Sequence, residues 1–180
     1  MIRALLIASA LCASPALAQH AIPYSGMQQR EIRALSPQQV EDLLAGRGMM
    51  LALAAELNGW PGPMHVLELA GPLGLTPEQR RETEALMAAH RAEARRLGAE
   101  IVEAERGLDA AFRERRITPA EITAKTERIG ALQAALRAEH LRTHLLQTAL
   151  LSTAQVTRYA ELRGYAGGAA SPAPAHRHRH

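Results

Sequence analysis

The sequence predicts an all-α protein whose main part is a long antiparallel helical hairpin, with additional N-terminal helices and a short C-terminal helix. Four helix-start signals recur along the chain. The strong helix formers Ala, Leu, Glu and Arg dominate the composition, whereas aromatic residues make up only 3%. No stretch of useful length alternates polar and apolar residues as a strand does. Such a chain favours amphipathic helices packed side by side.

Each helix-start signal is Leu or Ile, then Ser or Thr, then two residues, then Gln or Glu. The hydroxyl can accept a hydrogen bond from a backbone N–H at the helix start, and the Gln or Glu can bond back to the capping residue. Three copies also place Pro at the first helical position, where its missing N–H costs nothing. The four copies are Leu35–Gln39, Leu75–Gln79, Ile117–Glu121 and Leu151–Gln155.

These signals, together with the turn residues, predict the helices in chain order. We expect residues 19–34 to be extended and residues 35–165 to form one helical domain. Gly46 and Gly48 interrupt the first helix and allow either a close approach to another helix or a kink. A short connection between the two longest helices predicts that they lie antiparallel. The predicted helices are Pro37–Leu57, Met64–Ala70, Thr76–Arg115, Thr118–Ala149 and Thr153–Arg163.

The two ends of the chain have compositions unlike the rest. A basic start, an apolar run over Ala4–Ala13 and the small residues of Ala16–Ala18 predict a signal peptide over residues 1–18. We therefore expect a periplasmic protein. Cys12, the only cysteine, lies in the part that would be removed. Residues 166–180 contain Gly, Ala, Ser and Pro before a His- and Arg-rich end, so we expect a disordered tail.

Composition and motifs disfavour two functional classes. The sequence has no nucleophile elbow, phosphate-binding loop, dinucleotide fingerprint or zinc-protease motif, and the mature chain would have no thiol, so an enzyme is not expected. The net charge is +3 at pH 7, with basic and acidic residues interspersed. An exported chain of this kind is not expected to bind nucleic acid.

The histidines are the candidate ligand residues. His140 and His144 are four residues apart on one predicted helix, so their imidazoles project from one face and can share a metal ion. Their alternative role is that of packed histidines, hydrogen-bonded within a partly polar seam between helices. His65 precedes the longest helix, and methionines lie near it in sequence. Together these donors would suit copper, nickel or zinc; the methionines are Met49, Met50 and Met64.

The second and fourth helix-start signals, Leu75–Gln79 and Leu151–Gln155, resemble the paired LTxxQ motifs of the Spy/CpxP family of periplasmic proteins. They lie at the start and just after the end of the predicted hairpin, as in that family, and the resemblance covers roughly residues 75–165. The family contains ATP-independent chaperones and a heavy-metal resistance and sensor branch. By position, the resemblance to that branch implies metal ligands at His65, Glu84, and His140 or His144.

The leading expectation is a periplasmic ATP-independent chaperone or envelope-stress protein, which would hold unfolded envelope proteins through weak apolar contacts and charge. The alternative is a heavy-metal-binding sensor or resistance protein, with a membrane-bound sensor as partner; a purely structural envelope protein is a third reading. No cofactor is required, apart from a copper, nickel or zinc ion in the second case. Narrow apolar stripes on the long helices leave surface uncovered, which predicts a homodimer.

Overall fold

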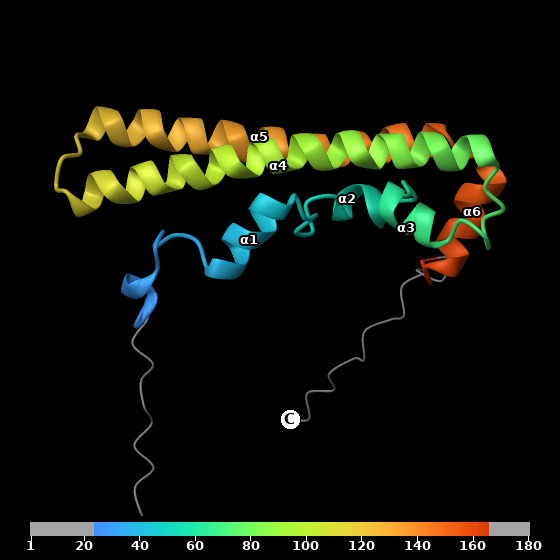
Figure 1. The fold of residues 1–180 in the computed structure, drawn as a ribbon, viewed down its shortest axis with the longest axis horizontal. Coiled ribbons are helices and arrows are strands. Elements are labelled where there is room, and N and C mark those ends of the chain that lie inside the picture. Colours follow the sequence, from blue (N-terminus) through green and yellow to red (C-terminus); the bar gives the residue numbers. More distant parts are fainter. Residues whose placement is uncertain (1–23, 166–180) are drawn as a thin grey trace, which may run out of the picture.

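A computed structural model describes residues 24–165; the predicted signal peptide and tail lie outside the described residues. Every regular element within that range is helical, and the two longest helices pack against each other, so the predicted all-α hairpin is confirmed (Figure 1). The elements are η1 (Met27–Gln29), α1 (Pro37–Ala45), α2 (Leu53–Glu56), α3 (Pro63–Glu68), α4 (Pro77–Arg113), α5 (Pro119–Ala149) and α6 (Thr153–Leu162).

The hairpin of α4 and α5 runs the length of the molecule, and the remaining helices lie on one side of it (Figure 1). Helix α1 packs on α4, α2 packs on α5, and α3 contacts both long helices. We call the end where α4 begins and α5 finishes the base, and the end at the α4–α5 connection the tip. Helix α6 turns across the base. None of the helices between residues 24 and 165 has the length and hydropathy needed to cross a bilayer.

All four predicted helix starts are confirmed, and each forms a complete capping box. The capping hydroxyl accepts a hydrogen bond from the backbone N–H three residues on, and the side chain of that later residue accepts one from the capping N–H. The capping residues are Ser36, Thr76, Thr118 and Ser152.

The two LTxxQ-like caps are also joined to each other. The amides of Gln79 and Gln155 exchange two hydrogen bonds of 2.9 Å, and Gln79 donates a further one of 2.8 Å to the Leu150 carbonyl. A carboxylate could accept but not donate in this arrangement. Glutamine at both positions therefore ties the start of α6 to the start of α4.

The first predicted helix is wrong in its extent. It ends at Ala45, because Gly46 adopts the left-handed conformation (φ 66°, ψ 36°) and caps α1 with its N–H. The chain then turns through residues 46–52, where Met49 and Met50 also have positive φ, before the short α2. The close helix approach occurs instead at Gly98 of α4, where a Cβ would lie only 2.0 Å from the Leu43 carbonyl oxygen.

The apolar core is confined to the middle and the base. One cluster joins α1, α4 and α5, and Ile32 from the N-terminal segment, expected to be extended, is buried in it. A second cluster at the base contains Val66, Leu73 and Tyr159. Between residues 103 and 128, which form the tip, no apolar residue is buried. The first cluster comprises Ile32, Leu43, Ala94, Leu97, Ile101, Val102, Leu132 and Leu136.

Candidate functional site

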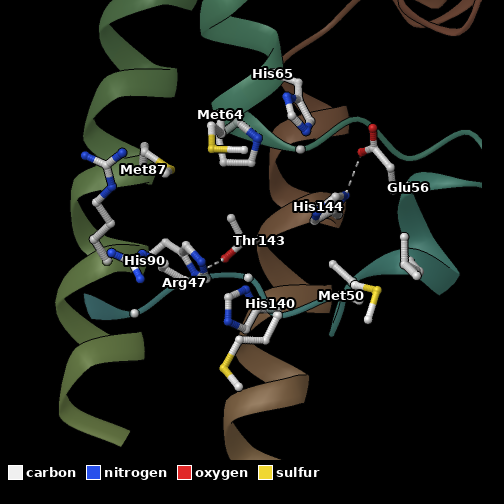
Figure 2. Close-up of a pocket in the computed structure, with 18 of the residues that line it drawn as sticks. Arg47, Met50, Glu56, Met64, His65, Met87, His90, His140, Thr143 and His144 are labelled. Atoms are coloured by element: carbon white, nitrogen blue, oxygen red, sulfur yellow. Dashed lines mark hydrogen bonds and ion pairs between the residues drawn. The ribbon is translucent and has the colours of Figure 1, made fainter. Parts of the chain in front are cut away.

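A cavity of about 620 Å³ lies between the hairpin and the segment that runs from α1 to α3. Histidines from three elements line it: His65 of α3, His90 of α4, and His140 and His144 of α5 (Figure 2). The rest of the lining includes thioethers, one carboxylate and three guanidinium groups. These are Met49, Met50, Met64, Met87, Glu56, Arg47, Arg91 and Arg95.

His90 and His140 face each other across the seam between α4 and α5. Their ring centroids are 4.6 Å apart in an edge-to-face arrangement, and both side chains are buried. His90 Nδ1 lies 3.1 Å from Glu139 Oε1 and 3.0 Å from Thr143 Oγ1. Thr143 already donates its hydroxyl proton to the Glu139 carbonyl, so Nδ1 of His90 is the donor and its Nε2 keeps a lone pair.

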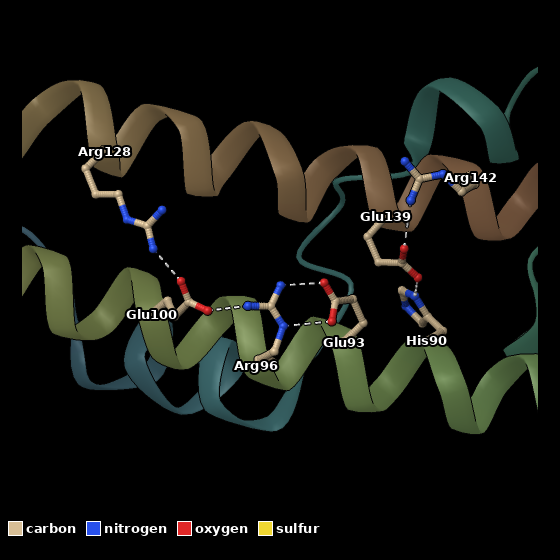
Figure 3. A network of polar contacts seen from close by, with 7 residues as sticks. All are labelled: His90, Glu93, Arg96, Glu100, Arg128, Glu139 and Arg142. Atoms are coloured by element: carbon tan, nitrogen blue, oxygen red, sulfur yellow. Dashed lines mark hydrogen bonds and ion pairs between the residues drawn. The ribbon is translucent and has the colours of Figure 1, made fainter.

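Glu139 is itself held from the solvent side. Arg142 donates to its second oxygen at 3.2 Å, so a chain of contacts runs from Arg142 through Glu139 to His90 (Figure 3). Further along the hairpin, Arg128 of α5 pairs with Glu100 of α4 at 2.6 Å. Exposed pairs of this kind contribute about 0.2–1 kcal/mol each. Only the Arg142–Glu139 pair reaches the site, where it helps to orient His90.

His140 is neutral because of where it lies. Burial, with a smaller effect from His90, lowers its pKa from 6.5 to about 4. Its Nε2 atom is buried and has no hydrogen-bond partner among the described residues. A buried polar atom left without a partner costs about 1–3 kcal/mol. His140 itself is one of the residues that line the cavity.

His65 and His144 are oriented by their Nδ1 atoms in the same way as His90. His144 donates Nδ1–H to the Trp60 carbonyl at 2.7 Å, and His65 Nδ1 lies 2.8 Å from Glu68 Oε2. A carbonyl or carboxylate can only accept, so Nε2 is the atom that keeps a lone pair in both neutral rings. Gly62 leaves space beside His144, since a Cβ there would lie 2.8 Å from its Nε2.

Among residues 24–165, Glu56 of α2 is the only carboxylate that lines the cavity. Its side chain is buried, its Oε1 accepts a 2.6 Å hydrogen bond from Tyr159, and its Oε2 has no hydrogen-bond partner among residues 24–165. Burial and this bond raise the pKa of Tyr159 above its usual range. In the described part of the chain, buried side-chain atoms without a hydrogen-bond partner occur in Glu56, His140 and Gln147, and the first two of these line the cavity.

The structure brings together three of the four predicted ligand residues. His65, His140 and His144 all line the cavity, whereas Glu84 lies in a neighbouring groove of about 370 Å³ with Met64 and Met87. The sequence motifs single out neither His90 nor Glu56. The available signal for His90 was its spacing, four residues after Leu86 and seven before Leu97, which places a histidine in the apolar stripe of this helix.

The histidines do not form a closed site in this conformation. Within residues 24–165, no group of three His, Asp or Glu side chains is close enough to hold an ion as it stands. The cavity nevertheless gathers four imidazoles, of which three have Nδ1 anchored and Nε2 unengaged. An anchored N–H on the ring edge away from the metal is typical of metal-ligating histidines.

Fold and site together define a helical-hairpin protein with a histidine- and methionine-lined cavity at its base. A family model described as heavy-metal resistance matches residues 43–158, which is more than half of the chain. The protein therefore belongs to the heavy-metal resistance family of the Spy/CpxP-like LTxxQ superfamily, as its motifs predicted. No curated protein and no solved structure matches the chain.

Proposed function

We propose that this protein binds a soft or borderline transition-metal ion in the cavity and acts in the periplasm as a heavy-metal sensor or resistance protein. The observation that carries the proposal is the convergence of four histidines, three with Nδ1 donated to an acceptor, on one cavity at the hairpin base. The family to which the chain belongs supports the same reading. The periplasmic location rests on the signal-peptide pattern of residues 1–18.

The donor set suits copper, nickel or zinc, and copper best. Imidazole nitrogen suits all three ions, and the four methionines that line the cavity add thioether sulfur, which favours copper in its Cu(I) state. His140 and His144, with His65 and a methionine, are the residues that would hold the ion. When bound, it would link the α3 segment to α5 through coordinate bonds. Neutral His140 needs no deprotonation before it binds.

Calorimetric titration of the mature chain without residues 166–180 tests the proposal, because the tail histidines are then absent. With Cu²⁺ or Ni²⁺ we expect one ion per chain, and weaker binding of Zn²⁺. His140→Ala and His144→Ala should each reduce the affinity at least tenfold. Glu84→Gln is the matched control, since Glu84 lies outside the cavity. Stoichiometric binding that survives both histidine substitutions would contradict this site.

A chaperone function is the second candidate, and one observation favours it. Large apolar side chains are exposed on α5 and on the α2–α3 connection: Leu145 and Leu146 are each 50% exposed, Leu57 is 57% exposed and Trp60 is 41% exposed. Such a surface can hold an unfolded chain through weak contacts. The test is suppression of client aggregation at stoichiometric protein, with the homodimer checked by sedimentation. No suppression across several clients would remove this candidate.

A further inference from the structure

Glu56 connects the cavity to the last helix. Its Oε1 accepts hydrogen bonds from Tyr159 of α6 at 2.6 Å and from Tyr165, just after α6, at 3.1 Å. Arg163 Nε lies 3.5 Å from the same oxygen. One carboxylate oxygen on α2 is therefore the common partner of three side chains from the C-terminal end of the described chain.

The other oxygen of Glu56 faces the opposite way. Oε2 is buried without a hydrogen-bond partner in residues 24–165 and lies 3.7 Å from Nδ1 of His144 (Figure 2). The same Nδ1 donates to the carbonyl of Trp60, four residues after Glu56. Two acceptors from one short segment thus flank the Nδ1 side of this imidazole and direct its Nε2 edge toward Gly62.

We infer that Glu56 is a positioning residue for the metal site and that α6 holds it in place, so that occupancy of the cavity and docking of α6 are coupled. This inference rests on the proposed function, because it assigns His144 Nε2 as a ligand. A group that accepts the N–H of a ligating imidazole fixes the ring and raises its basicity, and loss of such a partner typically reduces metal affinity 10–100-fold. The Trp60 carbonyl accepts this bond in His144, and Glu56 acts beside it through its charge at 3.7 Å. Here the carboxylate is in turn fixed by two tyrosine hydroxyls.

The coupling acts in both directions. An ion on Nε2 makes the Nδ1–H of His144 a stronger donor to the Trp60 carbonyl and increases the positive charge that the ring presents to Glu56 Oε2, 3.7 Å away. The ion therefore favours the position of Glu56 in which both tyrosines are bound to it. By thermodynamic linkage, the factor by which α6 docking raises metal affinity equals the factor by which metal favours α6 docking. Helix α6 suits this role because it is short and terminal in the described chain, and such elements open more readily than a core.

A merely structural role for Glu56 predicts different results. In that case Tyr159→Phe would loosen α6 and leave the metal affinity unchanged. The matched control is Thr83→Val, which removes another buried hydrogen bond, from Gln147 at 3.2 Å, without contacting Glu56. Both variants delete one buried hydroxyl near the base of the hairpin.

The experiment combines calorimetry with Ni²⁺ or Cu²⁺ and amide hydrogen exchange of residues 153–165, using the mature chain without residues 166–180. We expect Tyr159→Phe to weaken metal binding about tenfold and Thr83→Val to change it less than twofold. Metal should slow exchange in α6 of the wild type about tenfold, and not in Glu56→Gln. If Tyr159→Phe does not fold, Tyr165→Phe, which loses only the longer bond, should show a smaller effect in the same direction.

The outcomes separate this inference from the function on which it rests. Wild-type affinity in folded Tyr159→Phe and Tyr165→Phe, with one ion still bound per chain, overturns the coupling and leaves the metal site standing. Metal-independent exchange in α6 of the wild type, with the ion bound, overturns it as well. Failure of the wild type to bind either ion overturns the proposed function and the coupling together.

Discussion

The seam between α4 and α5 changes character along its length. Its middle, which we call the apolar stretch, runs over Ala94–Val102 of α4 and Ile129–Leu136 of α5, and most of its buried residues are aliphatic. Its base, the polar stretch, runs over Thr83–His90 and His140–Gln147. Every buried residue there is polar: Thr83, His90, His140, Thr143 and Gln147.

The residues of the apolar stretch stabilise the fold, whereas those of the polar stretch supply the polar groups of the candidate site. Burying a leucine or isoleucine contributes about 1.5–3 kcal/mol, so the apolar stretch can carry the hairpin. Buried polar atoms contribute only when paired, and the polar stretch keeps unpaired atoms on His140 and Gln147. Local violations of good packing of this kind are expected at functional sites. Substitutions in the two stretches should therefore separate stability from metal affinity.

The largest effect on stability is expected from Leu97→Ala in the apolar stretch. Leu97 is 4% exposed and belongs to the cluster that joins α1, α4 and α5. Its truncation removes apolar contacts and leaves a cavity, which should lower the free energy of unfolding by about 2–5 kcal/mol. Metal affinity, measured by calorimetry well below the melting temperature, should stay within twofold of the wild type. A tenfold loss of affinity would contradict the separation of the two stretches.

A smaller loss is expected from Gly98→Ala, although alanine is the better helix former. The added Cβ would lie 2.0 Å from the Leu43 carbonyl oxygen, so α1 would have to move away from α4. Overpacking of this kind costs about 1–3 kcal/mol. Urea unfolding should show the loss, and Gly130→Ala on α5, where nothing lies within 4 Å of the added Cβ, is the matched control. Gly130→Ala should be neutral or stabilising.

His140→Leu should have the opposite effects to Leu97→Ala: little change in stability and a large loss of metal affinity. Leucine removes a buried nitrogen that has no partner, so the free energy of unfolding at pH 7 should change by less than about 1 kcal/mol, or rise. Metal affinity should fall at least tenfold. A loss of stability as large as that of Leu97→Ala would identify His140 as a packing residue, the alternative role that the sequence left open.

The same variant tests the pKa of His140. Because the pKa of His140 is about 4 in the folded protein and the usual pKa of histidine is 6.5, the unfolded chain binds more protons between those values. Stability should therefore fall as pH drops through that window, and His140→Leu should lose this component. The melting temperatures of the wild type and of His140→Leu are measured between pH 7 and 4. Their difference at each pH reports the titration of His140 alone, because the carboxylates titrate in both proteins. Parallel curves would show that His140 does not titrate this way.

Local sequence signals predicted most of the fold, because the capping chemistry is local. Ser36 and Thr76 mark the starts of their helices because each forms its capping hydrogen bonds with a residue only three positions away. The end of α1 was missed because Gly46 reads equally well as a tolerated helical glycine, and its left-handed conformation depends on the chain packing back against Arg95. The requirement for glycine at position 98 could not be predicted from the sequence either, because it arises from contact with Leu43, which is far away in the sequence.

The candidate site was predicted in part for the same reason. His140 and His144 share one helix face, so their spacing alone places them together. Glu56 could not be found, because its role depends on Tyr159, which is 103 positions away. The sequence shows His90 as a polar residue within an apolar stripe, but it does not predict that His90 packs against His140 across the seam. Long-range packing, rather than any motif, decides which of these side chains reach the cavity.

The sharpest test of the site is expected from Gly62→Ala. Gly62 has an extended backbone (φ −93°, ψ 150°) that alanine adopts freely, so the only cost is displacement of the His144 ring, and the free energy of unfolding should fall by no more than about 1 kcal/mol. The added methyl would lie 2.8 Å from Nε2 and 2.7 Å from Cε1 of His144. The methyl would therefore occupy the space through which an ion must approach Nε2. Metal affinity should fall at least tenfold although no ligand has been altered.

Gly48→Ala, whose Cβ would meet nothing within 4 Å at the same cavity, should leave the affinity unchanged. If calorimetry gives both variants wild-type affinity, His144 does not bind the ion through Nε2, and the site has to be built on the His90–His140 pair.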